Sequence, residues 1–198
     1  MFASIKSCFT RALLALLFFG ASGATLAGPV YRVSVDTGNW SGSGYLNLTL
    51  SGLEKAAPVT ATVSNFTGSF GAATYTQGQV AGDIGSGFTL AQGPSFNELL
   101  QALDFGGLFT FEVRLKAPPG MLDGAWFGVA LVNAGIDAYA DGLVGDIAGV
   151  NLMPGAPDAP WADARFVEIA EVPEPGSAAL VALGLMLAGV RLKRRPQR

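Results

Sequence analysis

The stretch LFTFEVRLK, residues 108–116, indicates the fold class of this chain most clearly. Apolar side chains occupy every second position from Phe109 to Leu115, and polar or charged side chains fill the positions between them. A period of two is that of a β-strand with one face in a core and the other in water. Such half-buried strands are typical of antiparallel sheets, so this stretch predicts one.

The same alternation recurs on both sides of that stretch. Gly, Pro, Asn and Asp separate the alternating segments, as turns require. Further strands are expected at Tyr31–Asp36, Leu46–Ser51, Val59–Phe66, Gln79–Asp83, Gly87–Ala91, Trp126–Asn133, Leu143–Leu152 and Arg165–Val172. Many short strands with Gly-rich turns predict a mostly β chain folded as an antiparallel β-sandwich of jelly-roll type.

One segment carries a helical pattern instead. Ser95 and Glu98 are spaced as a capping box, in which each side chain bonds the other residue's backbone amide. Leucines at helical spacing follow, and Gly106-Gly107 ends the run. A short helix is therefore predicted at Phe96–Leu103.

Composition excludes several kinds of chemistry. The 198 residues contain no His and a single Cys, Cys8, so His-dependent catalysis, an intrachain disulfide and a multi-Cys zinc site are absent. The net charge is −3, but residues 28–172 carry 14 acids and five bases, which argues against nucleic acid as a partner. No cofactor motif is present, and we expect no enzymatic activity and no cofactor.

The N-terminus has the pattern of a secretory signal. Lys6 and Arg11 precede a short apolar run at 12–19, and small residues follow. This predicts export and cleavage by signal peptidase after Ala27, with Ala24 as the alternative position.

The C-terminus combines three ordered elements. Pro173-Glu174-Pro175 is followed by the apolar run 178–190 and then by a basic end. Thirteen helical residues reach about 20 Å, short of a hydrocarbon core of about 30 Å, so the run predicts a marginal membrane helix at about 177–192. The basic residues of tail 191–198 would remain in the cytoplasm; they are Arg191, Lys193, Arg194, Arg195 and Arg198.

This tail resembles the PEP-CTERM sorting signal of Gram-negative bacteria. The resemblance implies that exosortase, a membrane peptidase, recognises the motif and that the protein is sent to the cell surface or the matrix. The segments Tyr31–Gly52 (YRVSVDT, WSGSGYLNLTLSG) and Ser95–Gly107 (SFNELLQALDFGG) are also similar to a small group of PEP-CTERM ectodomains of unknown function. That group supplies no site residues.

Two aromatic residues are candidates for stacking on sugar rings. Trp40 and Trp161 lie in loop-like contexts, where a flat indole face can meet a pyranose ring. Packing within the domain is the alternative role for both. Trp126 lies in a strongly apolar segment and is expected in the core.

Acidic residues offer two further interpretations. Asp137, Asp141 and Asp146 form an oxygen-rich segment that is a candidate Ca²⁺ site, although its spacing is not that of an EF-hand loop. Solvated turn acids are the alternative. Paired carboxylates could also serve a glycoside hydrolase, but any Asp-rich chain offers such pairs.

These features predict three parts. They are a signal peptide at 1–27, a β-sandwich ectodomain at 28–171 and a sorting signal at 172–198. The leading hypothesis is a non-enzymatic protein with a periplasmic ectodomain, held transiently in the inner membrane, processed by exosortase and released to the cell surface or biofilm matrix, where it binds exopolysaccharide. The alternatives are a secreted carbohydrate-active hydrolase and a Ca²⁺-stabilised adhesion module.

Overall fold

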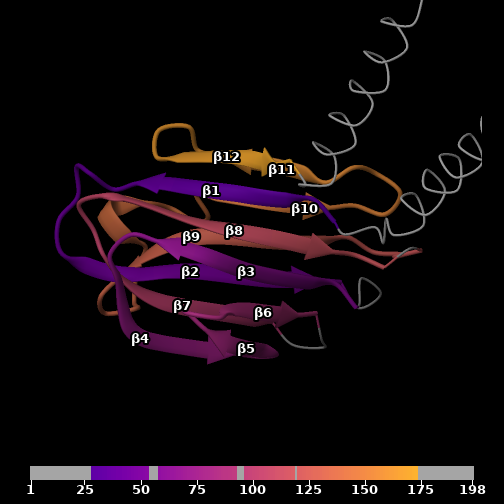
Figure 1. Ribbon diagram of the computed structural model, residues 1–198, viewed down its shortest axis with the longest axis horizontal. Coiled ribbons are helices and arrows are strands. Elements are labelled where there is room, and N and C mark those ends of the chain that lie inside the picture. Colours follow the sequence, from indigo (N-terminus) through magenta and orange to yellow (C-terminus); the bar gives the residue numbers. More distant parts are fainter. Residues whose placement is uncertain (1–27, 54–57, 93–95, 119, 174–198) are drawn as a thin grey trace, which may run out of the picture.

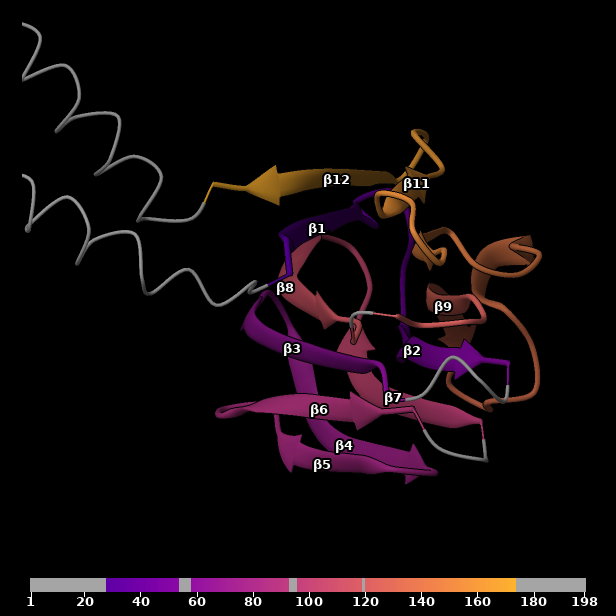
Figure 2. The ribbon, with the colours of Figure 1, turned by 90° about the vertical axis from the view of Figure 1, so that its right-hand side faces the viewer.

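The computed structural model describes residues 28–53, 58–92, 96–118 and 120–173. They form two six-stranded antiparallel sheets packed face to face (Figures 1 and 2). Sheet A has the order β12 (Val167–Val172), β1 (Val30–Asp36), β8 (Leu108–Lys116), β3 (Thr60–Thr67), β6 (Gly87–Ala91) and β5 (Val80–Asp83). Sheet B has the order β11 (Ala159–Ala162), β10 (Ala148–Leu152), β9 (Ala125–Asn133), β2 (Ser43–Gly52), β7 (Asn97–Asp104) and β4 (Phe70–Gln77). The mostly β fold and the antiparallel sandwich are confirmed.

The core lies between the sheets and follows from the alternation. The apolar residues at every second position of β8 and β2 point inward, and side chains such as Phe111 and Leu48 are fully buried. Phe127 of β9, the neighbour of β2 in sheet B, is also fully buried and belongs to the same core cluster. Burying each such side chain stabilises the fold by about 1.5–3 kcal/mol, so packing is the main stabilising contribution in a domain that has no disulfide.

The expected helix at Phe96–Leu103 is wrong, because Asn97–Asp104 forms β7 between β2 and β4. Leu99 and Leu103 point into the core from this strand, and Leu100 is buried on its other face. The Leu spacing fits either structure, and pairing with two neighbouring strands decides it. Ser95 of the presumed capping box lies outside the described residues.

Two buried polar residues fix β7 in place. Gln101 Nε2 donates to the carbonyl oxygens of Gly71 (2.7 Å) and Ala73 (3.3 Å), where the pairing of β4 with β7 is irregular. Asn97 Nδ2 donates to the carbonyl oxygen of Leu50 at 3.2 Å. These bonds satisfy backbone groups that the strand ladder leaves open.

The remaining differences concern edges and loops. β4 and β11 are edge strands of sheet B that the sequence did not indicate, and the expected strand at Leu143–Leu152 begins only at Ala148. Residues 134–147 instead form a loop with a short 3₁₀ turn at Ala140–Gly142.

The start of the first strand and the end of the last strand lie on the same side of the sandwich. Every odd-numbered strand begins there and every even-numbered strand ends there, including β12. Val30 and Val172 are register partners at this end, which we call the termini end; it is the right-hand end in Figure 1. The opposite, or distal, end carries the turns after β1, β3, β5, β7, β9 and β11.

Several expected features lie outside the described residues. They are the signal peptide with Ala27, the motif residues Glu174 and Pro175, the membrane helix at about 177–192 and the basic tail. Within the described ranges, the structure contains no helix that is both long and apolar enough to cross a membrane.

Candidate functional site

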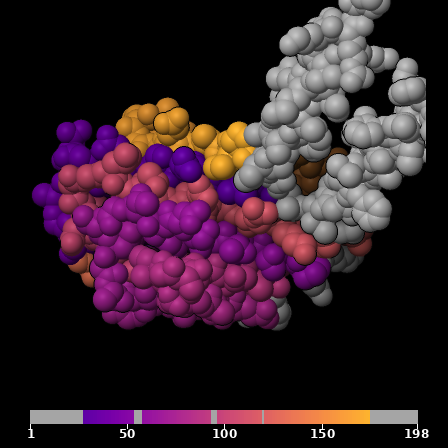
Figure 3. Space-filling view, in the orientation of Figure 1, coloured from indigo at the N-terminus to yellow at the C-terminus, as the bar shows by residue number. Residues whose placement is uncertain are grey.

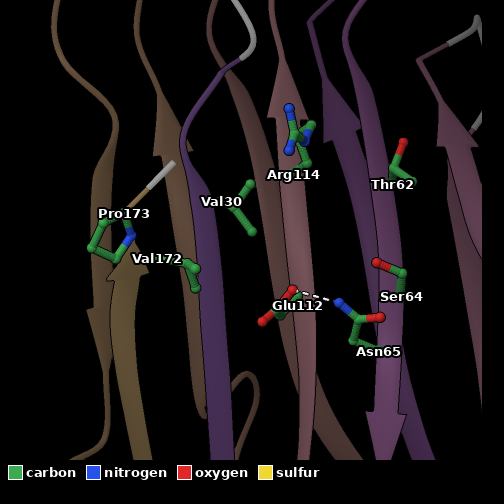
Figure 4. Close-up of a pocket in the computed structure, with 8 residues that line it drawn as sticks. All are labelled: Val30, Thr62, Ser64, Asn65, Glu112, Arg114, Val172 and Pro173. Atoms are coloured by element: carbon green, nitrogen blue, oxygen red, sulfur yellow. Dashed lines mark hydrogen bonds between the residues drawn. The ribbon is translucent and has the colours of Figure 1, made fainter. Parts of the chain in front are cut away.

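The outer face of sheet A carries a depression of about 290 Å³ with a mixed polar and apolar lining (Figure 4). β8, β3, β1 and the end of β12 contribute its lining, so it lies toward the termini end. Val30, Val172 and Pro173 form its apolar side, and Thr62 and Ser64 bring hydroxyl groups from β3.

Glu112 of β8 is the acidic group of this depression. Its Oε1 accepts hydrogen bonds from Arg32 Nη2 (2.7 Å) and Nε (3.2 Å), and its Oε2 accepts one from Asn65 Nδ2 (2.6 Å). The bonds from Arg32 and then Asn65 hold the pKa of the Glu112 carboxyl below its usual range. Glu112 is therefore ionised at neutral pH and does not serve as a proton donor.

Asn65 owes its position to an unusual backbone. Its φ is +56°, and the pairing of β3 with β8 shifts register between Ser64 and Thr67. Asn tolerates this left-handed conformation better than most residues. The bulge turns the Asn65 amide toward Glu112, so the strained strand serves the polar network.

Arg114 is a different kind of group from Arg32. It lies on the same outer face of β8, between Val30 and Thr62 in the strand register, and is exposed. Across the described residues, no ion pair is found for it. The lining thus offers one free guanidinium and hydroxyl groups, with a single carboxylate that is already bonded. Such a set suits binding of a polar ligand, and a two-carboxylate hydrolytic site is not assembled in this depression.

The outer face of sheet B carries a pair of stacked indoles, which we call the Trp pair (Trp126 and Trp161). Their ring centroids are 6.1 Å apart and their planes are inclined by 19°. Trp126, expected in the core, lies on the outer face of β9 and is half-buried, because Phe127 takes the inward direction. Trp161 on the edge strand β11 is 41% exposed.

Two glycines make room for the Trp pair. A Cβ at Gly149 would overlap the Trp126 ring, and a Cβ at Gly128 would lie 2.8 Å from Trp126 Nε1. Trp126 Nε1 donates to Asp146 Oδ2 at 2.8 Å. Burial raises the pKa of the Asp146 carboxyl, and the bond from Trp126 opposes that shift. The Trp126 indole thus lies against the backbone of Gly128 and Gly149, and its N–H is bonded to Asp146.

Trp40 lies in a different environment. It is half-buried at the distal end and contacts Phe105 and Phe166 edge to face, with centroid distances of 5.5 and 5.4 Å. These contacts give it a packing role, whereas Trp161 presents an open indole face. The two tryptophans that the sequence treats alike therefore differ in exposure and in their neighbours.

The three candidate calcium ligands have separate environments. Asp137 Oδ1 accepts a bond from Asn133 Nδ2, and Asp146 accepts the bond from Trp126. Asp141 sits in the 3₁₀ turn with φ +47°. In the part of the chain that the structure describes, no three acidic or other ligating side chains form a group able to hold a metal ion.

Sequence reasoning missed the groups of the sheet A depression and the partner of Trp161. The alternation placed Glu112 and Arg114 on a wet face, but the register that brings Arg32 and Asn65 to Glu112 has no local signal. Comparison of the chain with family models, curated proteins and solved structures finds no match.

Proposed function

We propose that this chain is an exported, non-enzymatic surface protein that is anchored briefly in the inner membrane, processed by exosortase at Pro173-Glu174-Pro175 and released into a polysaccharide-rich matrix. Its ectodomain binds exopolysaccharide through the Trp pair. The signal-like N-terminus and the resemblance of the tail to the PEP-CTERM signal support export and processing.

One structural observation carries the proposal. The last strand ends at Val172, and the first residue of the motif, Pro173, follows it directly and is exposed. Proline fixes its own φ and biases the preceding residue toward extended backbone. A peptidase that takes extended chain can therefore meet the motif without unfolding the sandwich.

The proposed start of the mature chain is Gly28. Gly28 already packs on β8, since a Cβ there would overlap the carbonyl oxygen of Leu115. Cleavage after Ala27 would leave Gly28 as the first residue of the mature chain, and this contact with Leu115 would be retained. Cleavage after Ala24 would leave three additional residues.

The finer architecture is part of the proposal. We propose a jelly-roll type of sandwich, in which β1-β8-β3-β6 faces β2-β7-β4. Within β1-β8-β3-β6 and within β2-β7-β4, no two neighbouring strands are consecutive in sequence, as in connected Greek keys, and this order supports the assignment.

A double variant tests the processing step. Pro173→Ala with Glu174→Ala removes the motif but leaves the sandwich, the apolar run and the basic tail. We expect the variant to accumulate as an unprocessed membrane form in a host that contains exosortase. Normal release of this variant would contradict the proposal, and the wild-type chain in a host without exosortase is the matched control.

A further inference from the structure

Exposed large apolar residues lie at both ends of the sandwich: Leu53, Phe96, Leu122 and Met153 at the termini end, and Leu108, Ile136, Tyr139 and Val144 at the distal end. We name Leu53, Phe96, Leu122 and Met153 the apolar rim; each is exposed and lies in a connection after β2, β6, β8 or β10.

The loops of the apolar rim are neighbours in space. Leu53 N donates to the carbonyl oxygen of Gly124 at 3.3 Å, and a Cβ at Gly124 would lie 3.2 Å from Met153 Sδ. Gln92 Nε2 donates to the carbonyl oxygen of Gly52 at 3.3 Å, which joins the connection after β6 to the end of β2. The rim is therefore a surface at one end of the molecule.

Charge is distributed unevenly between the two ends. Among the described residues, the distal end carries one base, Arg165, and seven acids; they are Asp36, Asp83, Asp104, Asp137, Asp141, Asp146 and Asp163. The termini end carries Arg114 and Lys116 at the close of β8, along with the acids Glu98, Asp123, Asp158 and Glu171. An anionic surface would accordingly repel the distal end far more than the termini end.

The sequence after Pro173 indicates that the surface facing the apolar rim is a membrane. The apolar run begins at Ala178, five residues after Pro173. Five extended residues span at most about 17 Å. An anchored chain therefore holds the end of β12, and with it the termini end, within about 17 Å of the hydrocarbon, whereas the distal end lies a strand length farther along the sandwich.

We infer that the termini end is a membrane-docking face, on which the apolar rim enters the interface of the bilayer while Arg114 and Lys116 lie near lipid phosphates. Apolar side chains gain free energy in the headgroup and acyl boundary, and nearby bases gain from anionic lipid. Docking sets the domain upright and keeps Pro173 at the membrane surface, where a membrane peptidase acts. This inference rests on the proposed membrane anchor.

The full chain in vesicles tests the docking face. With Cys8→Ser as background, a single cysteine is placed at Leu122→Cys in the rim or at Leu108→Cys at the distal end, and each is labelled with a nitrobenzoxadiazole dye. The two leucines are 71% and 62% exposed, so the labels are matched in exposure. The vesicles contain phosphatidylethanolamine and phosphatidylglycerol, with a fraction of lipids spin-labelled near the headgroup.

We expect the label at 122 to shift to the blue and to be quenched by the spin-labelled lipid, while the label at 108 stays in water and is quenched by iodide. Leu53→Ser with Met153→Ser should reduce the blue shift at 122. Equal, water-like signals at both positions on chains that float with the vesicles would overturn the docking face alone. Chains that do not float with the vesicles would overturn the membrane anchor and the docking face together.

Discussion

Val30 of β1 and Val172 of β12 are register partners, so the first and last strands of the domain meet where the chain enters and leaves it. Because the chain enters and leaves the domain on the same side, no linker is needed to expose the segment that follows β12. This relationship joins the fold to the proposed processing, because Pro173, the first residue of the motif, directly follows β12 at the edge of sheet A. It also orients the sandwich whenever the tail is in a membrane.

The bonds to Glu112 predict a pH-dependent contribution to stability. Its folded pKa is lowered, so the stabilisation is present above the unfolded pKa of a glutamate and is lost as pH falls through the folded pKa. Glu112→Gln should lower the free energy of unfolding at neutral pH by about 0.5–1 kcal/mol, since Arg32 is more than half exposed. Urea unfolding across acidic pH measures this, and the variant should show a shallower acid limb than the wild type. An identical pH dependence would contradict the role given to Glu112.

The charge of Asp146 should lower the stability of the fold, whereas the charge of Glu112 raises it. Its folded pKa is raised by burial, so the cost of its charge is absent below the unfolded pKa and fully present once pH rises above the folded pKa. Asp146→Asn keeps an oxygen acceptor for Trp126 and should leave stability at neutral pH unchanged or higher. Asp146→Leu leaves the indole N–H unpaired and should cost about 1–3 kcal/mol. Thermal unfolding of the two variants separates charge from hydrogen bonding, and equal losses in both would refute this account.

Trp161 and Trp40 form a matched pair for the binding proposal. Trp161→Ala removes the exposed ring of the Trp pair and should abolish retardation of the protein in gels that contain exopolysaccharide, at a stability cost of about 1 kcal/mol. Trp40→Ala removes contacts with Phe105 and Phe166 and should cost about 2–4 kcal/mol without loss of binding below the melting temperature. Gly149→Ala, which displaces Trp126 yet deletes no aromatic ring, should also weaken binding. Retained binding in both Trp161→Ala and Gly149→Ala would remove the Trp pair as the glycan site.

Gln101 tests the strand that the sequence did not predict. Gln101→Leu keeps an apolar side chain of similar size but leaves the carbonyl oxygens of Gly71 and Ala73 without their donor. We expect a loss of about 1–3 kcal/mol by chemical denaturation. A helix at this segment would tolerate the same change, so an unchanged stability would argue against β7.

Prediction from sequence succeeds where one face of a strand is apolar. β1, β2 and β8 alternate clearly because one side of each meets the core and the other meets water. β7 fails this test because Leu99 and Leu100 are buried on opposite faces, so its pattern also fits a helix. β4 has almost no buried residue to mark it, and β11 is a four-residue edge strand that contains Pro160.

The candidate site was less accessible to sequence reasoning than the fold. In the sequence, Trp161 and Trp40 have similar loop-like contexts, but Trp161 lies on the edge strand β11 and its stacking on Trp126 depends on the registers of β9, β10 and β11. The network around Glu112 depends in the same way on long-range pairing and on a positive φ at Asn65. Side-chain contacts that depend on how distant strands pair do not appear as a periodic pattern in the sequence.

Mass spectrometry of both ends of the extracellular protein tests the central claim most directly. Cells that produce exosortase should secrete a chain that begins at Gly28, ends close to Pro173-Glu174-Pro175 and lacks the run 178–190 with its basic tail. Cells without exosortase should retain that run in the membrane fraction. An intact chain from Met1 to Arg198 recovered in solution from the cytosol would contradict the account.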